Sequence, residues 1–136
     1  MLKLSLMTFV LLLDAACTAR TPINRAWITP APAGNVFIHI VAPSKLAEYI
    51  KRNEIYFSIV VNECDGSGKR FPLEPMVQGA RASKFDFKIT GPTIEFTSMS
   101  PRWAIEKYKN PCAVLEGGGY SGARLKSGMA RIQPAA

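Results

Sequence analysis

The chain has 136 residues, of which 48% are hydrophobic and 20% are charged, and its formal net charge is +7. This length suffices for one domain with a modest core and is too short for two domains with a hydrophobic core each. The hydrophobic fraction is ordinary for a chain that folds. The positive charge favours negatively charged surroundings, although the basic residues are scattered along the sequence.

The N-terminal segment is a mainly apolar run that follows one basic residue. Lys3 precedes the run of residues 4–13, and the small residues Ala15 and Ala16 lead to Cys17. This order is typical of a secretory signal peptide. The run is about ten residues long, whereas crossing the hydrocarbon core takes roughly twenty, so we do not expect a permanent transmembrane helix.

The pair Ala15-Ala16 before Cys17 resembles the lipobox of bacterial lipoprotein precursors, with Asp14 where that family usually has an apolar residue. In the family, the signal peptide is cleaved before the cysteine, whose thiol is acylated. The resemblance implies a signal peptide at residues 1–16 and lipidation at Cys17. Thr18 in place of an aspartate implies the outer membrane. Cleavage after Ala19, which gives a secreted soluble protein, is the alternative.

The cysteine count supports a lipid anchor. The chain has three cysteines, and an odd number in an exported protein leaves one unpaired. If Cys17 carries lipid, Cys64 and Cys112 remain as a pair. Their bond would remove unfolded-state entropy worth roughly 4 kcal/mol, and an oxidising compartment permits it. We therefore predict a disulfide between Cys64 and Cys112.

The first predicted elements after the anchor are a linker, a strand, a helix and a second strand. Residues 21–34 contain three prolines and no sustained period, so residues 17–34 are interpreted as lipid anchor and proline-rich linker. The run "VFIHIVA" predicts a strand with Val36, Ile38 and Ile40 on one face. A short helix then begins at Ser44 as its N-cap. The run "IYFSIVVNEC" predicts a long strand that ends at the turn "DGSG".

The second half of the chain also has strand-like patterns. The runs "KFDFKI" and "TIEFTSM" predict a half-buried hairpin around Gly91. Ser100-Pro101 predicts the start of another short helix. The runs "CAVLE" and "ARLKSGMARI" predict a closing pair of strands around a glycine loop.

These elements predict a mainly β fold, a small antiparallel β-sandwich of immunoglobulin-like size with two short helices, over residues 35–132. Residues 133–136 are interpreted as a tail. An α+β fold is the alternative. The immunoglobulin signature itself is missing, because Trp103 precedes Cys112 instead of following the first cysteine of the pair.

Motifs for catalysis or cofactor binding are incomplete. The glycines of residues 117–122 match a dinucleotide fingerprint, but neither a helix pattern nor an acidic residue follows. Ser121 lacks a histidine after it, and His39 is the sole histidine of the chain. One histidine with two bonded cysteines cannot supply a zinc site. We therefore predict no cofactor, no metal and no enzymatic activity.

The leading hypothesis is a non-enzymatic periplasmic binding or envelope-assembly module. Its expected partner is an acidic protein or an anionic envelope component, and not nucleic acid, which is scarce in the periplasm. The candidate partner-binding residues are Gly117, Gly118, Gly119, Tyr120, Lys69 and Arg70. One alternative is a periplasmic inhibitor or immunity protein against a cell-wall hydrolase. A third is a small wall hydrolase that uses the carboxylates of Glu63 and Asp65.

Overall fold

Strands make up most of the chain in the computed structural model, which describes residues 18, 19, 21–81 and 85–134. In chain order the elements are β1 (Thr18–Ala19), β2 (Arg25–Pro30), the 3-10 helix η1 (Pro32–Gly34), β3 (Asn35–Pro43), α1 (Ser44–Arg52), β4 (Tyr56–Glu63), β5 (Phe71–Leu73), β6 (Met76–Val77), β7 (Ala80–Arg81), β8 (Thr93–Pro101), α2 (Arg102–Glu106), β9 (Pro111–Gly118), β10 (Arg124–Lys126) and β11 (Ala130–Gln133). The predicted mainly β class is confirmed.

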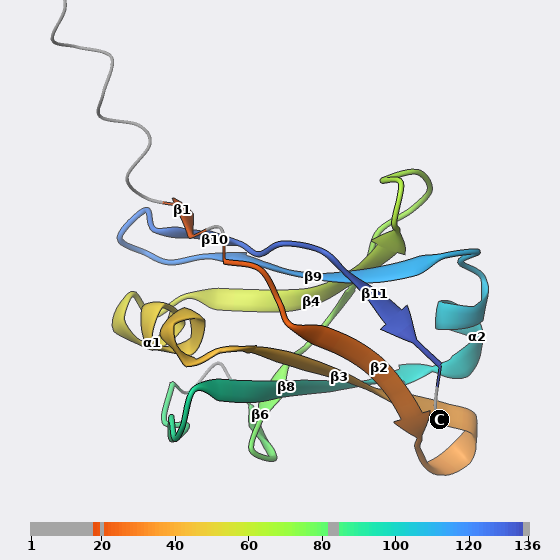
Figure 1. The fold of residues 1–136 in the computed structure, drawn as a ribbon, viewed down its shortest axis with the longest axis horizontal. Coiled ribbons are helices and arrows are strands. Elements are labelled where there is room, and N and C mark those ends of the chain that lie inside the picture. The colour runs from red at the N-terminus through yellow and green to blue at the C-terminus, as the bar shows by residue number, and fades with distance from the viewer. Residues whose placement is uncertain (1–17, 20, 82–84, 135–136) are drawn as a thin grey trace, which may run out of the picture.

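The strands of the described chain form one curled sheet of eleven strands (Figure 1). Its main path runs β1, β10, β9, β11, β2, β3, β8, β6 and β7, and β4 pairs with β9 and with β5 off this path. β11 joins the two halves, because it pairs antiparallel with β9 and parallel with β2. The predicted sandwich of two separate sheets is therefore not confirmed.

The core lies inside the curl, where both halves of the sheet present apolar side chains. Val36, Ile38 and Ile40 of β3 share the buried face that their alternation predicts. Phe57 of β4 and Phe96 of β8 meet edge to face, with ring centroids 5.3 Å apart. The two halves are thus held together by direct aromatic packing.

The two predicted helices are present at opposite ends of the sheet (Figure 1). α1 packs Leu46, Ala47 and Ile50 into the core. Ser44 does not cap this helix as predicted, because its hydroxyl donates to the carbonyl oxygen of Gly91 at 2.6 Å. The hydroxyl instead ties the start of α1 to the turn before β8.

The stretch predicted to be a linker contains a strand. β2 pairs with β3 along all six of its residues, and it also pairs with β11. Ile23 and Ala26 are buried in the core. An extended stretch that contains prolines can remain unpaired in solution or pair with a neighbouring strand. Here it pairs with β3 and β11, which supply its hydrogen-bond partners. The folded part therefore starts well before residue 35, while Cys17 and the predicted signal peptide lie outside the described residues.

The predicted hairpin at residues 84–89 and 93–99 is wrong in its first half. Residues 85–90 form no strand, and Phe85 has a φ of 53°, which interrupts an extended backbone. Phe87 is nevertheless buried in the core. The second half forms β8, which pairs with β3 and β6 and not with residues 85–90. The alternation of apolar residues in 85–90 therefore reflects the packing of a loop onto the core.

The predicted disulfide between Cys64 and Cys112 is confirmed, with 5.0 Å between the two Cα atoms. It links the residue after β4 to β9, and these two strands also pair along their whole lengths. Such bonds persist in oxidising compartments and are rare in the cytosol.

Candidate functional site

A row of polar side chains crosses the outer face of the sheet over β4, β9 and β10. Ser58 of β4 is paired with Glu116 of β9, and Lys126 of β10 is paired with Glu116 from the other side. Residues two apart on a strand share a face, so Arg124 also lies on the outer face. The register therefore places Glu116 between β4 and two cations of β10.

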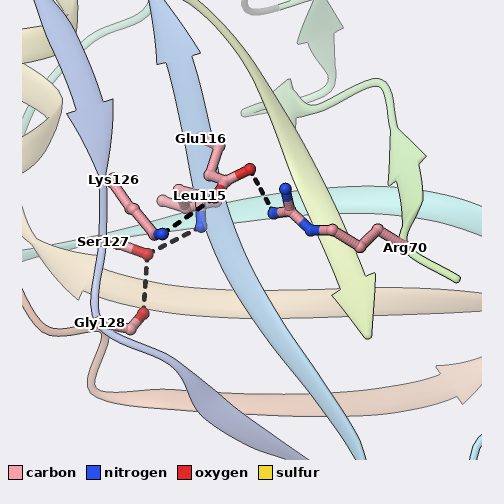
Figure 2. A network of polar contacts seen from close by, with 6 residues as sticks. All are labelled: Arg70, Leu115, Glu116, Lys126, Ser127 and Gly128. Carbon is pink, nitrogen blue, oxygen red and sulfur yellow. Dashed lines mark hydrogen bonds and ion pairs between the residues drawn. The ribbon is translucent and has the colours of Figure 1, made fainter. Parts of the chain in front are cut away.

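This face is indented by a groove of about 640 Å³. It is lined by Ser58, Val60, Arg70, Pro72, Glu116, Gly117, Arg124, Leu125 and Lys126. Arg70, just before β5, extends past β4 so that its Nη2 bonds Oε2 of Glu116 (Figure 2). Lys126 approaches the same carboxylate, with its Nζ 3.9 Å from Oε1. The groove is thus bridged by side chains from three parts of the chain.

The floor of the groove is apolar. Val60 and Val114 are paired on the outer face of β4 and β9, and yet both are buried. Pro72 of β5 lies opposite Val60, and the Arg70 side chain passes over β4. An apolar floor with a few charged groups at its walls is the usual composition of a ligand-binding cleft.

The walls of the groove are positively charged. The described lining residues include three cations, Arg70, Arg124 and Lys126, and Glu116 is the one acid among them. Because Glu116 can neutralise one unit of charge, the groove keeps a positive excess. Guanidinium and ammonium groups in this arrangement attract carboxylate or phosphate groups.

The turn between β9 and β10 adjoins the groove. A hollow lined by Gly117, Gly118, Gly119, Gly122, Ala123 and Arg124 shares Gly117 and Arg124 with it. Tyr120 lies in this turn and is 90% exposed, with its ring centroid 5.8 Å from that of Tyr56. The turn therefore adds exposed aromatic surface next to the charged walls of the groove.

The predicted partner-binding residues are partly brought together. Arg70 lines the groove, the three predicted glycines line the groove or the hollow, and Tyr120 stands beside them. Lys69 is outside this lining; its carbonyl oxygen accepts a hydrogen bond from the Tyr108 hydroxyl at 2.5 Å. Burial, and to a smaller extent the nearby charge of Glu63, raise the pKa of Tyr108 above its ordinary value.

Sequence reasoning missed Glu116, Arg124 and Lys126. The alternation of Arg124 and Lys126 around the buried Leu125 is a local signal that both cations face outward. That they meet Glu116 follows from strand register, which the sequence pattern does not specify.

Glu63 and Asp65, the carboxylates of the hydrolase hypothesis, accept hydrogen bonds from the backbone of turns. Glu63 accepts hydrogen bonds from the backbone N–H groups of Lys109 and Asn110, at 2.6 and 2.9 Å. Asp65 Oδ1 accepts from the N–H of Ser67 at 2.8 Å, and hydrogen bonds from Ser67 lower the pKa of Asp65. Both carboxylates therefore bind backbone N–H groups of turns at this end of β4.

A buried hydroxyl supports the groove from beneath. Ser127 Oγ accepts from the N–H of Leu115 and donates to the carbonyl of Gly128, both at 2.8 Å (Figure 2). Ser127 is 6% exposed, so these groups have little access to water. The hydroxyl thus replaces a strand hydrogen bond where β10 ends.

We expect Ser127→Ala to lower the free energy of unfolding by about 1–3 kcal/mol, because the amide of Leu115 would lose its partner in a buried place. Urea denaturation followed by circular dichroism measures this change. Ser121→Ala, at an exposed position in the neighbouring turn, is the matched control and should leave stability unchanged. Equal stabilities of the two variants would contradict the structural role of Ser127.

The described residues offer neither a metal-binding cluster nor a membrane-spanning helix. They contain no group of three or more His, Cys, Asp or Glu side chains placed to hold a metal ion. Nor does any helix in these parts of the chain have the length and apolar character needed to cross a membrane.

Comparison of the chain with protein-family models and with curated proteins finds no match.

Proposed function

We propose that the protein is an exported, non-enzymatic binding module, anchored by lipid at Cys17, whose basic groove takes an acidic partner. The observation that carries the proposal is the groove itself, in which Arg70, Arg124 and Lys126 outnumber Glu116 above an apolar floor. The disulfide supports a place outside the cytoplasm. The partner is an acidic protein segment or an anionic component of the periplasmic envelope.

The groove is tested by reversing two of its charges. We expect Arg124→Glu with Lys126→Glu to weaken binding of poly-glutamate about tenfold, because the cations that attract carboxylates become repulsive. Isothermal titration or fluorescence anisotropy gives the dissociation constant, and raising the salt concentration should weaken the unaltered protein's binding.

The matched control for this test is Lys45→Glu with Lys88→Glu. Both lysines are exposed and outside the groove lining, and the variant has the same net charge as the groove variant. If both double variants lose affinity equally, overall charge accounts for the binding and the groove is not the site.

The exposure of Tyr120 favours a second candidate function. A tyrosine that is 90% exposed at the tip of a turn resembles the inserted side chain of an inhibitor. The immunity hypothesis then predicts that the protein protects cells against a wall hydrolase. Unchanged hydrolase activity with excess protein would exclude it.

A further inference from the structure

Aromatic side chains gather at one end of the sheet. Tyr56 and Tyr120 are 47% and 90% exposed, and their rings meet edge to face. The ring of Phe85 lies 5.2 Å from that of Tyr56, also edge to face. Tyrosine rings that are half apolar and half polar are enriched at the level of lipid headgroups. This trio is named the aromatic end below.

Charged residues of both signs flank the aromatic end, since the exposed Glu54 and Asp86 directly follow Asn53 and Phe85 in the chain, and two exposed arginines lie there as well. Arg124 follows the turn that holds Tyr120, and it is exposed. A Cβ on Gly119 would lie 2.6 Å from the carbonyl oxygen of Asn53, so the turn rests on the chain that leaves α1. The exposed Arg52 at the end of α1 is therefore close to the same end of the molecule. Figure 1 shows α1, β1 and the β9–β10 turn together there, with α2 at the opposite end.

The N-terminal chain enters the fold at this end as well. β1 pairs in parallel with β10, with Thr18 in register with Arg124. Further along, the N–H of Gly128 donates to the carbonyl of Thr21 at 3.0 Å. The chain thus contacts the sheet at Thr18, Ala19 and Thr21, where an extended proline-rich linker was predicted. An anchor at Cys17 would hold this end directly against the membrane.

We infer that the aromatic end, with Arg52 and Arg124, is a docking surface for an anionic bilayer. This inference rests on the lipid anchoring proposed above. The tyrosine rings lie among the headgroups, the two arginines face the lipid phosphates, and α2 points away from the membrane. The two exposed arginines beside the tyrosine rings, together with the position of β1, favour the bilayer over a protein partner for this end.

The experiment compares the depth of two tryptophans in the full chain. The protein is produced in a bacterial envelope, checked by intact mass, and reconstituted into vesicles of phosphatidylethanolamine and phosphatidylglycerol with brominated acyl chains, which quench nearby tryptophan. Tyr120→Trp with Trp103→Phe reports on the aromatic end. The unaltered protein, in which Trp103 of α2 is 67% exposed, reports on the opposite end, and Trp27 is common to both.

We expect at least twofold stronger quenching of the Tyr120→Trp protein than of the unaltered protein in the anionic vesicles. The difference should be smaller in phosphatidylcholine vesicles with the same brominated chains, because the arginines then meet no net negative charge. Equal quenching of both proteins in the anionic vesicles overturns the docking surface. Circular dichroism confirms that the variant is folded, as expected for a change at so exposed a position.

The intact mass separates this inference from the proposed anchor. A mass without acyl chains contradicts lipidation at Cys17. The quenching comparison on that same protein still decides the docking surface, since the arginines and tyrosines attract the anionic vesicles without the lipid. Stronger quenching then supports docking, and equal quenching overturns it.

Discussion

Removing the disulfide is expected to lower the free energy of unfolding by roughly 4 kcal/mol, which is a large part of the stability of a domain this size. The bond closes a loop with a sequence separation of 48 between Cys64 and Cys112. Without it, the unfolded chain regains the conformations that the closed loop forbids. The melting temperature should fall by roughly 15 °C.

Thermal denaturation followed by circular dichroism measures this effect on Cys64→Ala with Cys112→Ala. Alanine is the appropriate replacement because Cys112 is buried in β9. Cys17→Ala is the matched control, because Cys17 is outside the pair and its loss should leave the melting temperature unchanged. A fall of less than about 3 °C in the double variant would mean that β4 and β9 hold their register without the bond.

The disulfide also shows what the sequence was able to predict. Its partners were predicted from the count of three cysteines, with Cys17 set aside for the expected lipid, and this needs no knowledge of the fold. The buried face of β3 follows from alternation within nine residues. Both inferences use information that is local or that can be counted, and both are confirmed.

What the sequence did not predict depends on contacts between distant segments. The stretch 21–34, which contains β2, was interpreted as a linker because it has three prolines and no sustained period. β2 becomes a strand by pairing with β3 and β11. Phe85 and Phe87 alternate as in a strand, and yet Phe87 enters the core from a loop. In both segments the tertiary partner overrides the local pattern.

The residues of the candidate site also fall into some that local sequence patterns predict and others that depend on contacts between distant segments. Tyr120 and Arg70 were selected from a glycine-rich turn and a basic pair, and the structure places Arg70 in the groove and Tyr120 beside it. Glu116 was missed because its role depends on the registers of β4 and β10, which bring Arg70 and Lys126 to it. A groove between strands that are far apart in sequence is a property of register, and register was not predicted.

The space available for a side chain differs among the glycines of the predicted partner-binding turn. A methyl group on Gly117 would lie 2.1 Å from the carbonyl oxygen of Tyr56 and 2.6 Å from the Cα of Phe57. Both obstacles are backbone atoms of the paired strand β4, so they cannot rotate away. Gly117→Ala is therefore expected to push β4 from β9 and to lower the free energy of unfolding by about 3 kcal/mol or more.

Gly118→Ala is the matched control for this prediction, because it adds the same methyl group one residue further along β9. Its nearest contact would be the carbonyl oxygen of Ala123 at 3.7 Å, an ordinary van der Waals distance. Urea denaturation should show stability within about 0.5 kcal/mol of the unaltered protein for this variant. If Gly117→Ala were equally stable, the close approach of β4 and β9 would be wrong, and with it the geometry of the groove. If Gly118→Ala stays folded and binds poly-glutamate normally, Gly118 is not needed for binding, which supports the charged side chains as the groups that bind the partner.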